Sequence, residues 1–483
     1  MAQTESVINV DDNDDNNKIS PEQRIHFVDL VNTPKPTLTT IKLIGFIQSF
    51  SPENNQKVVD LWSSFTDKDI EEILRAGIAS LDDPDTPSDD NKYPNFNLDR
   101  AELLLYTSAL MGQRNTALVE EAQKEILELK KNPEKARSED IKKITKKLLE
   151  SEAPIREEAK EFGLEFTSIT ECNVVGGPYG GLYWSEKHNF IIVSFRGTDP
   201  LDLGEWLTDF SLQRVDARSF LFGEAHYGFY TNLFTDNTFS SAKSVKQCPA
   251  LRLVDAIRSR ANEIYKRTAQ PVNLWVTGHS LGAALATLFY ARILQSPTCL
   301  GDKVDIRDGI PFAPPLVGDS DFASGFQSLM NQQINYNKNF WRIVNDNDIV
   351  PRYPLGFHVP NLGHFLSKIN LLNYINVGDE VRFYQDGSKP SSERNLYGPD
   401  MDYLFIEQGL GLVDLGAFFG LSDQFDATPS GWNSFKNIFS LNFKVNSNVD
   451  YITPGFIRNH FSYRYFESIE KARKYWEPIN SEK

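Results

Sequence analysis

One serine of this chain stands in a setting that favours covalent catalysis. Ser280 is flanked by Gly278 and Gly282 in the pattern G-x-S-x-G. An apolar segment (272–278) precedes the motif and an Ala-rich apolar segment (281–294) follows it. This strand–turn–helix setting is typical of a nucleophile elbow, a turn so tight that a Cβ at either glycine would strike neighbouring backbone. We therefore expect the Ser280 hydroxyl to be exposed at the corner of the turn and to attack a carbonyl carbon.

The residues around Ser280 have other interpretations. A serine that merely caps a helix after a strand is the alternative, but the paired glycines favour the nucleophile. His279 precedes Ser280, yet adjacent residues on such a turn point in different directions, so we interpret His279 as a packing residue. The backbone N–H of Leu281, at the start of the expected helix, is a candidate donor to the charge that develops on the carbonyl oxygen.

A serine nucleophile needs a base, and the base needs an acid that orients it. Downstream of Ser280, the segment VNDNDIVP contains Asp346 and Asp348. The histidines that follow are His358, His364 and His460. His358 and His364 lie soon after the aspartates in a loop rich in Pro and Gly, whereas His460 lies far beyond. The residues alone leave the acid and the base undecided.

The composition restricts the partners. The net charge of −16 argues against nucleic acid and strongly anionic membranes, but not against neutral esters or neutral lipid surfaces. Cys172, Cys248 and Cys299 are odd in number and widely spaced, so we expect neither a disulfide framework nor a zinc site. The first twenty residues lack a secretion signal and no apolar run is long enough to span a membrane. An intracellular, cytoplasmic location is therefore expected.

The elements that must position these residues follow a regular pattern. From Glu165 onwards, short apolar strands alternate with amphipathic helices. Such alternation predicts an α/β fold, with a mostly parallel sheet and helices on both faces.

Six segments, in this order along the chain, resemble the class 3 lipase family, the fungal triacylglycerol-lipase type of α/β-hydrolase. They are FRGTDP (195–200), EWLTDFSL (205–212), HYGFY (226–230), GHSLGAALA (278–286), RIVNDNDIVPRYP (342–354) and NHFSYRYF (459–466).

The resemblance implies a site and a fold. The family's acid immediately precedes an Ile/Val-Val-Pro tripeptide, which selects Asp348, and its C-terminal element selects His460. Thr198 corresponds to the oxyanion residue and would supply its backbone N–H, with or without its hydroxyl, beside Leu281. The α/β-hydrolase fold carries no metal or organic cofactor in this mechanism, so we expect none.

Segment 199–210 occupies the position of the family's lid. An amphipathic lid helix would expose Leu201, Leu203, Trp206 and Leu207 when it opens at an oil–water interface. The alternative is a surface helix packed permanently over the sheet.

Composition, residue pattern and the resemblance together divide the chain. We expect a disordered acidic tail (1–20) and a mainly helical N-terminal extension (21–160), in which 101–112 is the first hydrolase helix and 113–160 a charged helical insert. Residues 161–483 form the hydrolase domain, with a long insert at about 386–455 before the C-terminal helix.

Three functions compete. The first is a lipase that hydrolyses acylglycerols through a Ser-His-Asp triad and an acyl-enzyme. The second is a phospholipase or an esterase of small or aryl esters in the same family. The third is a catalytically silent lipid-binding or scaffold protein, against which the complete set of Ser280, Asp348 and His460 argues.

Overall fold

The computed structural model describes most of the expected hydrolase domain. Its described residues are 67–82, 96–131, 137–172, 178–197, 213–234, 248–332, 338–346, 348, 350–352, 373–393 and 459–475. Thr198, the four candidate lid residues, the acidic tail, His358, His364 and most of the insert at 386–455 lie outside them.

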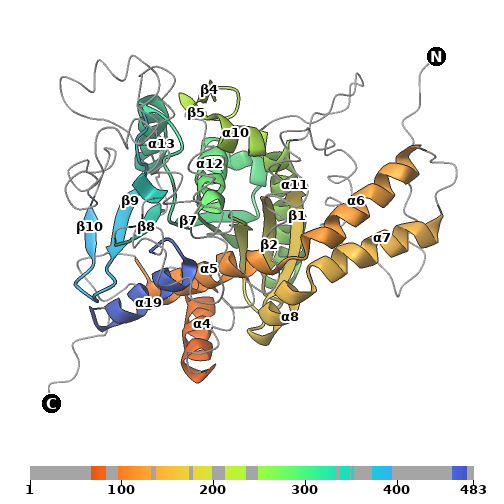
Figure 1. Ribbon diagram of the computed structural model, residues 1–483, viewed down its shortest axis with the longest axis horizontal. Helices are drawn as coiled ribbons and strands as arrows, with labels where there is room; N and C mark the ends of the chain where they lie inside the picture. The colour runs from red at the N-terminus through yellow and green to blue at the C-terminus, as the bar shows by residue number, and fades with distance from the viewer. Residues whose placement is uncertain are drawn as a thin grey trace, which may run out of the picture.

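A mixed sheet of eight strands forms the centre of the described structure (Figure 1). In sheet order the strands are β1 (Glu165–Glu171), β2 (Tyr179–Trp184), β3 (Phe190–Phe195), β6 (Val272–His279), β7 (Val304–Phe312), β8 (Trp341–Asn345), β9 (Asp379–Phe383) and β10 (Ser391–Glu393). The run from β3 to β9 pairs in parallel, whereas the pairs β1–β2, β2–β3 and β9–β10 are antiparallel. The predicted mostly parallel sheet is confirmed. A separate hairpin joins β4 (Arg214–Asp216) to β5 (Glu224–His226).

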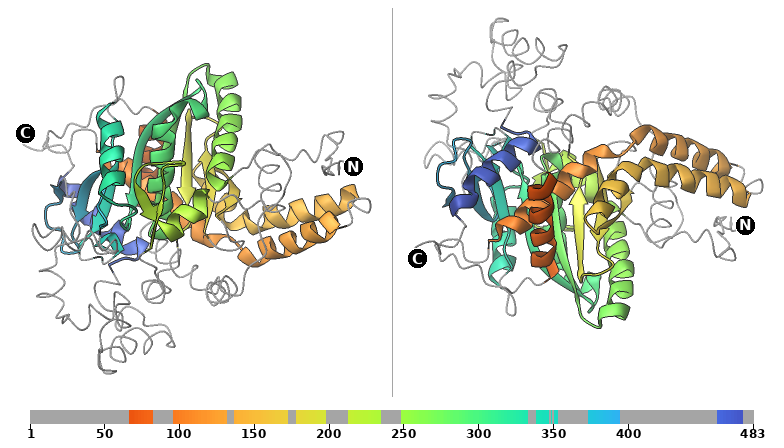
Figure 2. Two further views of the ribbon diagram at one scale, coloured as in Figure 1. Left: turned by 90° about the horizontal axis from the view of Figure 1, so that it is seen from above. Right: turned by 90° about the horizontal axis from the view of Figure 1, so that it is seen from below.

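Helices cover both faces of this sheet, as predicted. The α-helices of the described residues are α4 (Asp67–Asp82), α5 (Leu98–Leu110), α6 (Thr116–Lys131), α7 (Ser138–Ser151), α8 (Ala153–Glu161), α10 (Tyr227–Phe234), α11 (Pro249–Thr268), α12 (Leu281–Gln295), α13 (Ser320–Asn331) and α19 (Ser462–Ala472), and all but α6 and α7 lie close to the sheet. Figure 2 shows α4, α5 and α19 over the face seen from below. Side chains alternate across β6, so that Leu274 and Val276 join the core beneath α11 and α12, while Trp275 joins the core beneath α4 and α5.

Helices α6 and α7 form a hairpin that projects away from the sheet (Figure 2). It has its own small apolar core, which includes Val119, Ile126 and Ile144. Lys147 bridges the two helices through ion pairs to Glu121 at 2.7 Å and to Glu125 at 3.1 Å. The charged segment after residue 113 is therefore helical in its described parts, and its charges lie around a narrow apolar seam.

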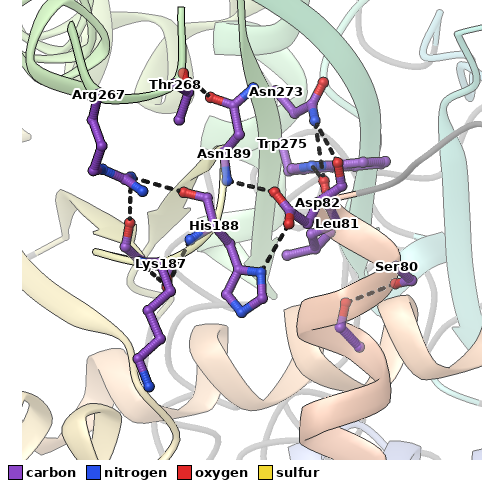
Figure 3. Close-up of polar contacts among 12 residues, drawn as sticks. Ser80, Leu81, Asp82, Lys187, His188, Asn189, Arg267, Thr268, Asn273 and Trp275 are labelled. Carbon is purple, nitrogen blue, oxygen red and sulfur yellow. Dashed lines mark hydrogen bonds and ion pairs between the residues drawn. The ribbon is translucent and has the colours of Figure 1, made fainter. Parts of the chain in front are cut away.

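The C-terminal end of α4 is capped by side chains from other elements (Figure 3). Its last turn contains no basic residue. Instead, the Arg100 guanidinium donates to the carbonyl of Ser80 at 3.0 Å, and the Trp275 indole donates to the carbonyl of Leu81 at 3.4 Å. Because the last carbonyls of a helix have no partner within it, these bonds fix where α4 ends against the sheet.

The carboxylate of Asp82 completes this attachment. It accepts from the backbone N–H of Asn189 and lies 2.9 Å from Nδ1 of His188, in the turn between β2 and β3 (Figure 3). Asn273, near the start of β6, donates to the carbonyl of Asp82 at 3.2 Å. The end of helix α4 thus lies at the amino ends of β3 and β6, and the G-x-S-x-G motif follows the opposite end of β6.

Candidate active site

Strand β6 turns sharply into helix α12 at Ser280. This serine has φ 58° and ψ −126°, a backbone conformation that residues with side chains rarely adopt. A Cβ on Gly278 would lie 2.4 Å from the carbonyl oxygen of Gly282, and a Cβ on Gly282 would lie 2.2 Å from that of Phe195. Only glycine fits at either position, which is the steric reason that the sequence suggested for a nucleophile elbow.

The end of strand β3 packs directly against this turn. Phe195 is paired with Gly278 in the parallel register of β3 and β6. A Cβ on Gly197 would lie 2.3 Å from the carbonyl oxygen of His279. The backbone before Thr198 therefore runs beside the elbow, while the role of Thr198 itself, outside the described residues, stays a prediction.

The structure brings Asp348 and His460 together across 112 residues of sequence. Nδ1 of His460 lies 2.9 Å from Oδ2 and 3.1 Å from Oδ1 of Asp348, and both side chains are fully buried. A carboxylate can only accept, so Nδ1 carries the proton and Nε2 is left with its lone pair. Nε2 is buried and has no hydrogen-bond partner among the described residues. That nitrogen is in the state a general base requires.

Two further donors hold the Asp348 carboxylate. The Tyr465 hydroxyl donates to Oδ2 at 2.6 Å, and the backbone N–H of Val350 donates to Oδ1 at 2.9 Å. Burial raises the pKa of Tyr465 well above its ordinary value, and the neighbouring carboxylate raises it further, so this phenol remains a donor. Sequence reasoning missed Tyr465, although its place in the segment NHFSYRYF, five residues after His460, was visible.

Asp346, the other candidate acid, has a different place. Its backbone has φ 44°, its N–H donates to the carbonyl of Phe383, and its own carbonyl accepts from Arg382 at 2.8 Å. Asp346 therefore shapes the turn after β8, whereas Asp348 is the aspartate that contacts the histidine.

His279 and Asn345 contact the segment that carries the base. Nε2 of His279 lies 2.8 Å from the carbonyl oxygen of His460, and the two imidazole rings are 4.8 Å apart between centroids. The amide of Asn345 donates to the carbonyl of Asn459 at 2.7 Å. Burial holds the pKa of His279 well below its ordinary value, so this ring is neutral. Sequence reasoning treated His279 as a packing residue and did not single out Asn345.

The expected exposure of the Ser280 hydroxyl is wrong for this conformation. Ser280 is 1% exposed, Leu281 is 7% exposed and His460 is fully buried. Within the described residues no group of His, Cys, Asp and Glu side chains could hold a metal ion, and no helix is long and apolar enough to cross a membrane.

Part of this chain is similar in sequence to known proteins. Residues 192–358, which include Ser280 and Asp348, match the family model described as Lipase (class 3). The chain is 30% identical over 187 residues to triacylglycerol lipase OBL1 of Arabidopsis thaliana. It is 34% identical over 279 residues to phospholipase A1-IIgamma of the same plant. Over residues 192–358, the chain is similar to the class 3 lipase family.

The chain spans only part of the length of those relatives. The two matches cover 34% and 51% of the chain, and 34% and 58% of the respective relatives. Among solved structures, the Rhizomucor miehei lipase propeptide complex is 18% identical with a TM-score of 0.33, covering 49% of this chain and 63% of that one. The Lip2 lipase from Yarrowia lipolytica is 19% identical with a TM-score of 0.31, covering 46% and 66% respectively.

Proposed function

We propose that this protein is a serine carboxylester hydrolase, with Ser280 as nucleophile, His460 as base and Asp348 as the orienting acid. One observation carries the proposal. A buried imidazole is held by a carboxylate through Nδ1, while its Nε2 has no partner among the described residues. The strained serine at the β6–α12 turn supports the same assignment, because strain of this kind gathers at catalytic sites.

The proposed reaction is acyl transfer in two steps. His460 removes the hydroxyl proton as Ser280 Oγ bonds to the ester carbonyl carbon, and then delivers that proton to the departing alcohol. Water attacks the resulting acyl-enzyme by the same proton transfers, which releases the acid and restores the serine. Asp348 keeps the imidazole in the reactive tautomer and balances the positive charge that it acquires.

The carbonyl oxygen becomes negative in each tetrahedral intermediate and needs donors placed in advance. Leu281 is the first residue of α12, where backbone N–H groups are free of helical partners and the helix dipole favours negative charge. We propose its N–H as one donor. Thr198 is proposed as the second, since the backbone that leads to it passes beside the elbow.

The substrates that we propose first are acylglycerols. Triacylglycerol lipases of Arabidopsis thaliana, Ricinus communis and Nicotiana tabacum are among the relatives. Phospholipids are the second candidate, favoured by the phospholipase A1-IIgamma match, which covers 51% of the chain. A catalytically silent lipid-binding role is disfavoured by the complete acid–base pair. Contact with a neutral lipid surface, a mobile lid and a cytoplasmic location stay predictions.

A substrate panel tests the proposal. Purified protein is assayed on p-nitrophenyl butyrate, on emulsified triolein and on phosphatidylcholine vesicles. We expect hydrolysis of the aryl ester and faster release of fatty acid from the glyceride than from the phospholipid. The opposite ranking would make the protein a phospholipase, and release from neither lipid would restrict it to small esters.

Two serine variants make the panel decisive. Ser280→Ala should lower turnover by about 10⁴-fold or more and prevent labelling by a fluorophosphonate probe. Ser194→Ala is the control, because Ser194 is also buried and its hydroxyl has no hydrogen-bond partner among the described residues. Labelling that persists in Ser280→Ala would overturn the assignment.

A further inference from the structure

His460 sits on a short turn immediately before α19, and two consecutive carbonyls of that turn accept side-chain hydrogen bonds. Asn345 donates to the carbonyl of Asn459 at 2.7 Å. His279, through Nε2, contacts the carbonyl of His460 at 2.8 Å. All four residues are buried, with exposed fractions of 8% or less.

The two donors come from the segments that carry the other reacting groups. His279 is the last residue of β6 and directly precedes Ser280. Asn345 is the last residue of β8 and stands three positions before Asp348. The last residues of β6 and of β8 therefore each form a hydrogen bond with the turn that carries His460.

The helix itself gives that turn little support. The first backbone carbonyl that accepts a hydrogen bond from α19 is that of Phe461, which accepts from the N–H groups of Arg464 and Tyr465. The carbonyls of Asn459 and His460 lie outside this ladder, so their partners must come from elsewhere. The N-cap position is occupied by Phe461, whose apolar side chain cannot cap the helix as Ser or Asp would.

We propose that His279 and Asn345 are positioning residues that hold His460 between Asp348 and Ser280. This proposal rests on the proposed function. A misplacement of about 1 Å at a reacting group can lower a rate by roughly 10²-fold. Two buried bonds on adjacent carbonyls restrict both the translation and the rotation of the turn, which a single bond would not.

His279 suits this task because its ring is neutral. As a donor through Nε2 it keeps its lone pair on Nδ1, and it carries no charge that would repel the imidazolium formed on His460 during the reaction. The centroid of the His279 ring also lies 4.8 Å from that of the His460 ring, with the two planes tilted by 35°, and 5.7 Å from that of the Tyr465 ring in a T-shaped contact. A lysine or arginine at this position would provide a donor but would oppose the charge on the base.

The orientation of the Asn345 amide is fixed from its other side. Its Oδ1 accepts from the Ser468 hydroxyl at 2.8 Å and from the Gln385 amide at 3.1 Å. Both of these contacts require oxygen at that end, which leaves the NH₂ group facing the carbonyl of Asn459. Ser468 lies within α19, so Asn345 binds the turn and its helix together.

The test compares variants that keep or remove each donor. His279→Phe keeps a ring of similar size without the N–H, and His279→Gln keeps an N–H donor without the ring. Thr277→Val is the matched control. Thr277 lies two residues before His279 on β6, and the change removes a buried hydrogen bond from its hydroxyl to the carbonyl of Ile310. Circular dichroism confirms that each variant folds.

We expect His279→Phe to lower kcat on p-nitrophenyl butyrate by about 10–100-fold, with KM changed less than about threefold. His279→Gln should recover most of that loss, and Thr277→Val should retain wild-type kcat. A kcat for His279→Phe within twofold of the Thr277→Val value, or no recovery in His279→Gln, would overturn the proposal. If His279→Phe does not fold, Asn345→Leu decides in its place, since leucine has a similar shape and removes the NH₂ donor without adding a charge; a kcat within twofold of the Thr277→Val value would then overturn the proposal.

A second readout does not depend on turnover. The Nδ1 proton of His460, bound to Asp348, should give a low-field proton resonance that is absent in His460→Ala. We expect this resonance to broaden or disappear in His279→Phe and to persist in Thr277→Val. If the wild-type protein hydrolyses no ester, the proposed function fails, whereas a resonance unchanged in His279→Phe refutes the positioning role alone.

Discussion

Replacing Tyr465 by Phe removes one hydroxyl and leaves the ring in place. That hydroxyl donates at 2.6 Å to Oδ2 of Asp348, and both side chains are fully buried. The change creates almost no cavity, so its effect reports the lost hydrogen bond. Asp348 would keep His460 on the same oxygen and the Val350 N–H on the other.

The size of the effect follows from the charge of the acceptor. A hydrogen bond to a charged group contributes about 1.5–3 kcal/mol, whereas a neutral pair contributes about 0.5–1.5 kcal/mol. Tyr465→Phe should therefore lower the free energy of unfolding by about 1.5–3 kcal/mol. Because two contacts to Asp348 remain, kcat should fall by only about 3–30-fold, far less than the roughly 10⁴-fold expected for Asp348→Asn.

The assay combines urea unfolding with turnover of p-nitrophenyl butyrate. Tyr290→Phe is the control, since its buried hydroxyl donates to the neutral carbonyl of Arg307 at 2.7 Å, far from the site. We expect the control to lose about 1 kcal/mol and to keep its kcat. If Tyr465→Phe loses no more stability than the control and its kcat is unchanged, the Tyr465–Asp348 contact does not support the acid.

Three further predictions address the scaffold. Burial raises the pKa of Asp308 from 3.8 to about 6. Since the pKa in the folded state exceeds that in the unfolded state, ionisation of Asp308 destabilises the fold above about pH 6 and not below about pH 4. In urea unfolding, the free energy of unfolding of Asp308→Asn should therefore rise by about 3 kcal/mol relative to wild type between about pH 4 and about pH 6. A difference that does not change with pH would contradict this. Gly282→Ala should abolish ester hydrolysis and lower Tm, because its Cβ would lie 2.2 Å from the carbonyl oxygen of Phe195; an active, equally stable variant would disprove the elbow geometry. Glu171→Gln should lower the free energy of unfolding by roughly 3 kcal/mol, because it removes the carboxylate that pairs with the buried guanidinium of Arg114; a loss below about 1 kcal/mol in urea unfolding would refute this.

The sequence by itself determined the features that depend on neighbouring residues. Two glycines around a serine, with an apolar strand before and an Ala-rich helix after, are local patterns, and the steric reason for them acts within a few residues. The alternation of strands and helices likewise predicted the mostly parallel sheet and its covered faces, because hydrophobic periodicity reflects which side chains meet the core. The choice of Asp348 and His460 came from resemblance to a family, since spacing alone left other candidates.

Only the tertiary structure decided which distant groups meet. Asp348 contacts His460 because α19 packs against β8, the strand that precedes Asp348, and no local pattern encodes a contact across 112 residues. For the same reason the donors Tyr465 and Asn345 were invisible to periodicity, and His279 was recognised as a packing residue without its bond to the base. The burial of Ser280 was also unpredictable, because exposure depends on everything that packs around a turn and not on the turn alone.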